Sequence, residues 1–244
     1  VLAGPDSWSN IVLKRIEIWD VFQKIIHTAA SQFTSSSFQG IRIHRTLTKE
    51  VSWVLSNIAG GTPEQCSRLV EMNFVPSLCI LLRESDFDVK REVAHVLFGI
   101  VCQNPTKHLT LILSQQGTLP VLVRLLCAPD PAMIHLGIGF VRNICDGVRN
   151  GKRMIEEVNG IELLENLQYR DNVPGELCRM AKDVVDRYFG EDEEDDDDDE
   201  NGMNMDFSNF TGFGDMGNSD DSTTTTRRIG VGRGAAMTKP AWMK

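Results

Sequence analysis

Three Leu-rich stretches decide the fold: FVPSLCILLRESDFD at 74–88, TLPVLVRLLCAPDP at 118–131 and GIELLENLQYRDN at 160–172. Their helices begin 44 and then 42 residues apart, at Leu78, Leu122 and Leu164. Each of these Leu-rich helices is preceded by a residue that suits the left-handed conformation at the end of a helix, namely Asn73, Gly117 or Gly160. A period of this size is typical of armadillo and HEAT arrays, in which helical units stack side by side.

Helix starts recur with the same period. Thr62-Pro63-Glu64-Gln65 combines an N-cap threonine, a first-turn proline and a capping-box glutamine. Asn104-Pro105 starts a helix in the same way 42 residues later. Long helices are expected at 88–102, 131–147 and 174–189, so that one unit contains two short helices and a long one. We count three units (62–102, 104–147 and 151–189) and the last helix of a fourth, at about 46–59.

A three-helix unit cannot bury its apolar face alone, so neighbouring units must stack into a continuous core. We therefore predict an all-α armadillo-repeat fold, a right-handed superhelical solenoid over 46–190 that binds partners along the concave surface of its long helices. Residues 1–45 contain a helix expected at about 10–31 and no clear repeat unit. They are interpreted as a diverged repeat or a replacement that caps the solenoid. Trp19 and Gln23 share a helix face there, but without a surrounding pattern we do not expect a groove pair.

Charge separates the body of the chain from its tail. Residues 191–200 read EDEEDDDDDE, and 191–244 hold 14 of the 34 acidic residues with 5 of the 25 basic ones. Residues 1–190 therefore carry 20 of each sign, and the net charge of −9 belongs to the tail. A neutral body lacks the basic stripe of a nucleic-acid groove, and no apolar run is long enough to span a membrane. The low-complexity 191–244 is predicted to be disordered, with electrostatic steering of a partner as the functional alternative.

The sequence contains no pattern of a catalytic, cofactor or metal site. No phosphate loop, HExxH or GxSxG is present, and the five histidines are scattered. The six cysteines form no CxxC pair, so buried, reduced thiols are expected. We therefore predict a binding protein and not an enzyme.

The long helices carry a pattern that resembles the importin-α (karyopherin-α) family. It begins with EVSWVLSNIAGG at 50–61, whose Trp and Asn are four residues apart, and continues through ESDFDVKREVAH at 84–95, APDP at 128–131 and MIEEVNGIELLENLQYRDN at 154–172. The acidic run after the last helix completes the resemblance, which covers about 46–200. It implies the C-terminal armadillo repeats: the minor groove for nuclear localisation signals, and a last repeat, 151–189, that the nuclear export receptor engages. The importin-β-binding arm and the major-groove repeats of that family have no counterpart in this chain.

The residues themselves support a receptor for an extended basic segment. Trp53 and Asn57 project from one face of a helix because they are four residues apart. An indole packs on the stem of a Lys or Arg and attracts its cation, while a carboxamide can hold a peptide backbone through its donor and acceptor. Glu50 and Glu92 would add charge-assisted hydrogen bonds to basic heads. A core position for Trp53, and a solvated face for the two glutamates, are the competing interpretations.

The sequence departs from the family pattern in the next two long helices. His95 stands at the Trp position and Gly99 at the Asn position, and then Gly139 replaces the Trp while Asn143 keeps the Asn. An imidazole offers less stacking area and would repel a basic peptide when protonated, and glycine supplies no clamp.

These observations predict a nuclear import adaptor of cytoplasm and nucleus, binding nuclear localisation signals through Glu50, Trp53, Asn57, Glu92 and Asn143. A generic armadillo scaffold, or a truncated competitor without full transport activity, is the alternative.

Overall fold

The structure is a computed structural model that describes residues 14–34 and 45–190 of the 244. Within these ranges the regular elements are helices, beginning with α2 (Ile16–Thr34) and α3 (Arg45–Ala59). Three units follow, each of two short helices and a long one: α4 (Pro63–Glu71), α5 (Val75–Glu84) and α6 (Phe87–Gln103); α7 (Pro105–Leu113), α8 (Thr118–Arg124) and α9 (Pro131–Gly147); α10 (Gly151–Glu157), α11 (Gly160–Asn166) and α12 (Gly175–Phe189). Short 3₁₀ turns, η1 (Leu125–Cys127) and η2 (Leu167–Tyr169), extend α8 and α11.

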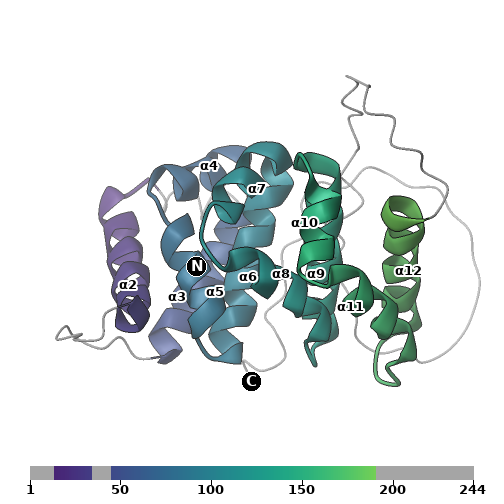
Figure 1. The fold of residues 1–244 in the computed structure, drawn as a ribbon. Helices are drawn as coiled ribbons and strands as arrows, with labels where there is room; N and C mark the ends of the chain where they lie inside the picture. The colour runs from purple at the N-terminus through teal and green to yellow at the C-terminus, as the bar shows by residue number, and fades with distance from the viewer. Residues whose placement is uncertain (1–13, 35–44, 191–244) are drawn as a thin grey trace, which may run out of the picture.

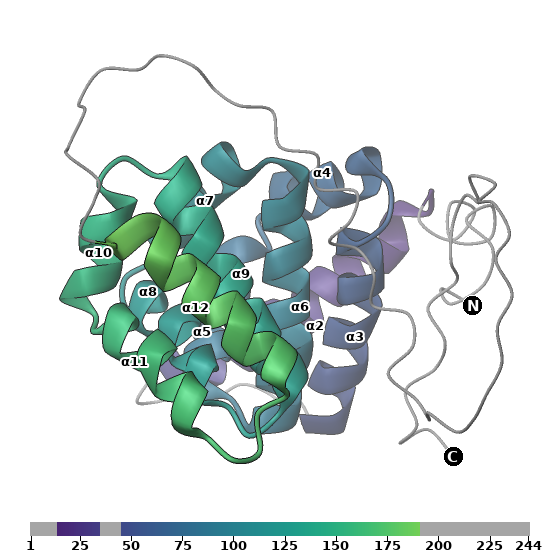
Figure 2. The ribbon, with the colours of Figure 1, turned by 90° about the vertical axis from the view of Figure 1, so that its right-hand side faces the viewer.

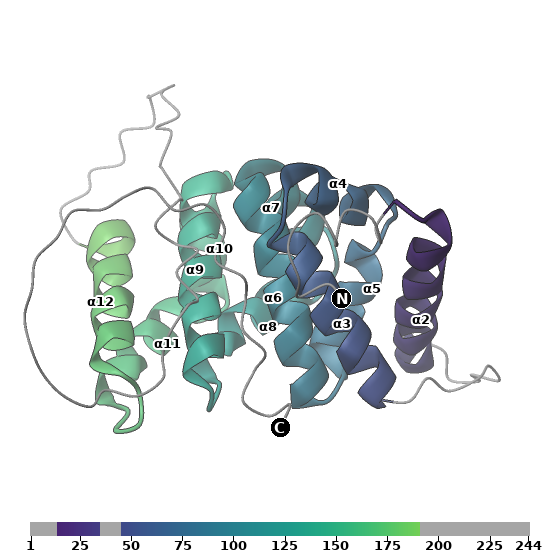
Figure 3. The same cartoon turned by 180° about the vertical axis from the view of Figure 1, so that it is seen from behind.

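Corresponding helices of successive units pack against one another, which makes the molecule an armadillo solenoid as predicted (Figure 1). The long helices α3, α6, α9 and α12 form one row, seen side by side in Figure 3, and α2, α5, α8 and α11 form a second. Viewed from the end of the array, α12 lies nearest the reader (Figure 2). Because α2 packs on both α5 and α3, it takes the place of the second helix in the unit that ends with α3.

Caps and turns fix the helix boundaries largely as predicted. The capping box of α4 is present, since Thr62 Oγ1 accepts from the Gln65 backbone and the Gln65 side chain accepts from the Thr62 N–H. Asn104 caps α7 by accepting from the Lys107 N–H at 3.2 Å. The predicted long helices agree with α3, α6, α9 and α12 to within about a residue at each end.

One predicted turn residue was wrong. Asn73 and Gly117 have positive φ as expected, but in the third unit Asn159 takes the left-handed conformation, with φ of 60°, and Gly160 does not. Gly160 opens α11 instead, and a Cβ there would lie 2.9 Å from the Ile155 carbonyl oxygen. The glycine is needed for close packing, while asparagine, which tolerates positive φ better than most residues, makes the turn.

A continuous apolar core joins the units. Phe98 of α6 and Phe140 of α9 stack edge to face with ring centroids 5.2 Å apart. Trp19 of α2 is 2% exposed and packs against Phe74 of the next unit, and Gln23 Nε2 donates to the Met72 carbonyl at 2.6 Å. Trp19 and Gln23 are therefore inter-repeat packing residues, which agrees with the expectation that they form no groove pair.

The first helix was predicted at about 10–31, whereas α2 covers Ile16–Thr34; residues 10–13 lie outside the described ranges, as does the predicted disordered tail, 191–244. Among the described helices, none is by itself long and apolar enough to cross a bilayer. The pair Pro105–Leu113 and Thr118–Cys127, bent by 113°, passes such a test jointly by length and composition alone.

Candidate functional site

Glu50, Trp53 and Asn57 lie along one partly exposed face of α3. The opposite face is buried in the core through Thr48, Val51, Ser52, Leu55, Ile58 and Ala59. Asn57 Nδ2 donates to the Trp53 carbonyl at 2.8 Å, and no described residue donates to its Oδ1. Within the described ranges the Trp53 indole makes no hydrogen bond or ring contact, and Glu50 makes no ion pair. These three side chains thus present an aromatic face, a carboxylate and an amide oxygen together.

Glu92 does not lie on a solvated face. It is 4% exposed, and its carboxylate accepts from Arg91 Nη2 at 3.3 Å. Burial raises the pKa of Glu92, and the neighbouring Arg91 opposes that rise. Lys49 and Glu50 of α3 also act electrostatically on Glu92, so this carboxylate belongs to the junction between α3 and α6.

His95 lies on α6 in the partly exposed stripe that also contains Arg91 and Gly99. The pKa of His95 is lowered to about 4, chiefly by burial and also by Arg91 and His135, while Asp130 opposes the shift. His95 is therefore neutral near pH 7, so the repulsion considered from the sequence does not arise there. The cation at this position is Arg91, whose Nη1 lies 3.7 Å from Asp130 Oδ2 at the start of α9.

Gly99 brings α6 against α3. A Cβ on Gly99 would lie 2.9 Å from the Ala59 Cβ and 3.0 Å from the Ala59 carbonyl carbon. This separation is shorter than real Cβ contacts, so the site has no room for the asparagine of the family pattern. Gly99 therefore allows α6 and α3 to pack closely, and it also leaves this position without a carboxamide that could hold a peptide backbone.

Asn143 repeats the local geometry of Asn57 in a buried setting. Its Nδ2 donates to the Gly139 carbonyl at 2.7 Å, and the residue is 5% exposed. It belongs to α9, which is separated from α3 by α6. The structure therefore brings together Glu50, Trp53 and Asn57, adds Glu92 at their edge, and leaves Asn143 two units away.

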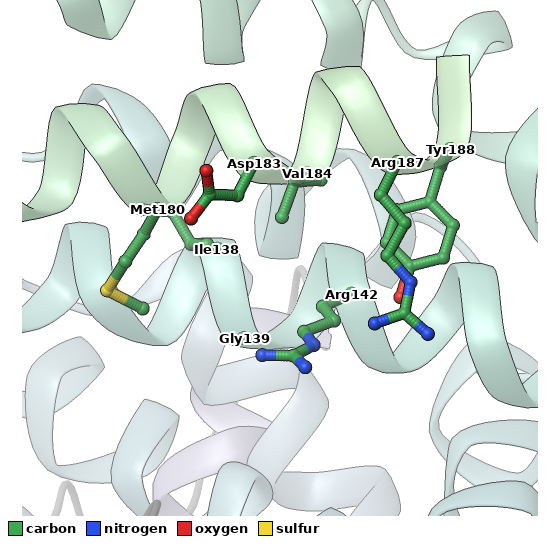
Figure 4. A pocket seen from close by; sticks show the side chains of 8 residues that line it. All are labelled: Ile138, Gly139, Arg142, Met180, Asp183, Val184, Arg187 and Tyr188. Atoms are coloured by element: carbon green, nitrogen blue, oxygen red, sulfur yellow. The ribbon is translucent and has the colours of Figure 1, made fainter. Parts of the chain in front are cut away.

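Sequence reasoning missed a pocket of about 260 Å³ between α9 and α12 (Figure 4). It is lined by Ile138, Gly139, Arg142, Met180, Asp183, Val184, Arg187 and Tyr188. Tyr188 is buried and donates to Asp146 Oδ1 at 2.6 Å, and burial together with this bond raises the pKa of Tyr188. The sequence held one signal for this pocket. Arg142 and Asp146 come three and seven residues after Gly139, so the helical period places all three on one face of α9.

The thiols and histidines do not form a second site. Within the described part of the chain, no group of three or more His, Cys, Asp or Glu is placed to hold a metal ion. Cys66 and Cys79 are buried, and burial raises the pKa of each thiol to about 11. Cys127 is exposed, contrary to the expectation of buried thiols; it is the last residue of η1, after the buried Leu125 and Leu126.

The sequence of these repeats is similar to that of several known proteins. Residues 152–204 match the family described as an atypical Arm repeat. Importin subunit alpha-2 of Oryza sativa subsp. japonica is 35% identical over 161 residues, which is 61% of this chain and 30% of that protein. Importin subunit alpha-9 of Arabidopsis thaliana is 35% identical over 160 residues, with the same coverage. Importin subunit alpha-8 of Mus musculus is 30% identical over 126 residues, 49% of this chain and 25% of the relative. The chain thus spans less than a third of the length of these curated relatives.

Solved structures give the same fold. A designed armadillo repeat protein in complex with the peptide (KR)4 superposes with a TM-score of 0.53 at 22% identity, over 68% of this chain and 64% of that one. An armadillo-repeats-only protein from Plasmodium falciparum gives a TM-score of 0.54 at 18% identity, over 70% of this chain and 75% of that one.

Proposed function

We propose that this chain, whose armadillo repeats are similar to importin-α subunits, acts as a nuclear import adaptor. It binds the basic nuclear localisation signals of cargo proteins at α3 and works in both cytoplasm and nucleus. The single observation that supports this role is the grouping of Glu50, Trp53 and Asn57 on one accessible face of α3, each with binding capacity left unused by the described residues.

Each of the three side chains has a distinct task in this proposal. The Trp53 ring packs on the aliphatic stem of a Lys or Arg and attracts its cationic head, which contributes about 0.5–2 kcal/mol. Asn57 Oδ1 accepts a backbone N–H of the extended peptide, while the bond from Nδ2 to the Trp53 carbonyl holds the amide in place. Glu50 accepts from a basic head. Glu92 is buried and paired with Arg91, so in this proposal it supports the face of α3 from the junction with α6. Asn143 is also buried and supports the row of long helices without contacting the peptide.

The test is titration of a fluorescent Lys/Arg-rich localisation peptide with the full chain, followed by anisotropy. Trp53→Ala should weaken binding about 5- to 30-fold, as the loss of roughly 1–2 kcal/mol requires, and Asn57→Ala should weaken it as well. The matched controls are Tyr169→Ala and Asn172→Ala, since Tyr169 is 83% exposed on η2 and Asn172 is exposed beyond it. The proposal would be wrong if the wild-type chain were helical but did not bind the peptide. It would also be wrong if the control substitutions weakened peptide binding as much as Trp53→Ala and Asn57→Ala do.

The last repeat, 151–189, is assigned the second partner, the export receptor of the family. Tyr169 is its most exposed aromatic residue in the described structure, and exposed tyrosines are frequent anchors of protein interfaces. Binding of the purified export receptor to the full chain, and its weakening by Tyr169→Ala, test this assignment. Receptor binding that Tyr169→Ala leaves unchanged would move the contact elsewhere, and no binding would eliminate it.

A generic armadillo scaffold, or a competitor without full transport activity, is favoured by a different observation. Gly99 is packed against Ala59 and Asn143 is buried, so only α3 presents an accessible Trp–Asn pair. Partners captured from lysate decide between the two functions. Loss of all of them on Trp53→Ala supports the adaptor, whereas partners retained by that variant support the scaffold.

A further inference from the structure

The pocket between α9 and α12 contains two cationic side chains that the proposed peptide site does not use. Arg142 enters from α9 and Arg187 from α12, and both line the same cavity (Figure 4). Neither guanidinium makes an ion pair with a described residue, and neither does Asp183, which lines the same pocket. By contrast, Arg91 of α6 is paired with both Glu92 and Asp130.

Tyr188 holds the two helices in position around these cations. Its hydroxyl donates to Asp146 Oδ1 at 2.6 Å, which ties the end of α12 to the end of α9. The Arg187 guanidinium carbon lies 5.2 Å from the centroid of the Tyr188 ring, a cation–π arrangement. Arg142 and Arg187 both act electrostatically on the Tyr188 hydroxyl, so the two cations share one small region.

The remaining lining restricts what the pocket can take. Ile138, Met180 and Val184 form an apolar wall, which suits the short aliphatic stem of an amino-acid side chain. Asp183 limits the positive charge of the cavity, so a dense polyanion such as a nucleic-acid backbone is disfavoured. A single carboxylate matches best, because guanidinium groups offer paired N–H donors in the geometry of carboxylate oxygens.

We propose that the pocket between α9 and α12 is a carboxylate-binding subsite, in which Arg142 and Arg187 hold an acidic side chain of an extended peptide. The carboxylate has two possible sources: a partner peptide lying along the long helices, or the chain's own acidic run at 191–200, which begins four residues after Arg187. The subsite does not depend on basic-peptide binding at Trp53, and the two proposals can fail separately.

The probe is a fluorescein-labelled peptide of alternating glutamate and glycine, titrated into the full chain at low ionic strength, with its glutamine counterpart as the control peptide. A second form of the full chain carries amide substitutions at all ten acidic positions of 191–200. Arg142→Gln/Arg187→Gln should weaken binding at least tenfold, and Arg142→Lys/Arg187→Lys should retain part of it. The control with the same charge change is Arg149→Gln/Arg179→Gln, at exposed positions outside the pocket. Circular dichroism verifies that each variant is folded.

If the probe binds the unmodified chain, and if replacing Arg142 and Arg187 weakens this binding, the result supports the subsite and assigns the carboxylate to a partner peptide. If the probe binds only the chain with amide substitutions at 191–200, again through Arg142 and Arg187, the result also supports the subsite and identifies the acidic run as its occupant. Failure of both forms to bind the probe overturns the proposal. Binding that the pocket substitutions reduce no more than the control substitutions overturns it as well.

Discussion

At the scale of single residues, Gly99 is the position where packing opposes intrinsic propensity. An alanine in the middle of a helix is ordinarily about 1 kcal/mol more favourable than glycine. At Gly99 the added Cβ would lie 2.9 Å from the Ala59 Cβ, and overpacking of this kind costs about 1–3 kcal/mol. We therefore expect Gly99→Ala to lower the urea midpoint of unfolding, measured by far-UV circular dichroism.

Gly175→Ala is the matched control for that change. Its added Cβ would meet nothing within 4 Å, so the substitution should be neutral or slightly stabilising. An increase in stability for Gly99→Ala would contradict the close approach of α3 and α6.

His95 makes a pH-dependent contribution to stability. Its pKa is lowered to about 4 in the folded chain, against about 6.5 when unfolded. The unfolded chain therefore binds more protons between these values, and the stabilisation present above pH 6.5 is lost as pH falls towards 4. The loss is at most about 3.4 kcal/mol. Glu92, whose pKa is raised, acts in the opposite direction below neutrality.

The difference between wild type and His95→Gln isolates the histidine from Glu92. Urea unfolding at a series of pH values from 7.5 to 4 should show a shallower loss of stability in the variant. Parallel pH profiles for the two proteins would show that His95 is not buried as neutral imidazole.

At the scale of the elements, Arg170 joins the third unit to the second. Its Nη1 donates to the Leu126 carbonyl at 2.9 Å and its Nη2 to the Ala128 carbonyl at 3.0 Å. These two carbonyls lie at the end of η1, one repeat earlier in the chain, where the helix itself supplies no donor for them. Arg170→Ala leaves both without their donor, so we expect a loss of about 2–4 kcal/mol in the free energy of unfolding.

Hydrogen exchange measures where that loss falls. Faster exchange in α11 and α12 is expected for Arg170→Ala, with α4 to α6 little changed, because each unit of a solenoid contacts mainly its neighbours. In Arg170→Lys the ammonium group can donate to one of the two carbonyls. Exchange in α11 and α12 of this variant should therefore be faster than in wild type and slower than in Arg170→Ala. The control is Arg179→Ala at an exposed position of α12, and an equal effect from it would contradict the role of Arg170.

At the scale of the whole molecule, the row of long helices changes character along its length. At α3 it presents an aromatic ring with an accessible carboxylate, near α6 and the start of α9 its charges are paired, and between α9 and α12 it presents two cations. A basic segment and an acidic group would therefore bind at opposite ends of the same face. The two titrations described above, with basic and acidic peptides, examine these ends independently.

The sequence by itself determined the helices and their repeat, because both depend on neighbours close in the chain. The Thr62 capping box, the period of 42–44 residues and the pairing of Trp53 with Asn57 on one helix face could all be derived from local patterns. The resemblance to the importin-α family rested on the same local motifs.

Tertiary structure alone decided how deep each side chain lies and what it faces. Glu92 and Asn143 are buried, Gly99 packs against Ala59, and Arg142 meets Arg187 across a pocket. Each outcome depends on a residue about one repeat away, on a helix whose distance and rotation no local pattern specifies. A one-residue difference in angular position around a helix is about 100°, which is enough to move a carboxylate such as that of Glu92 from the open face into the junction between units.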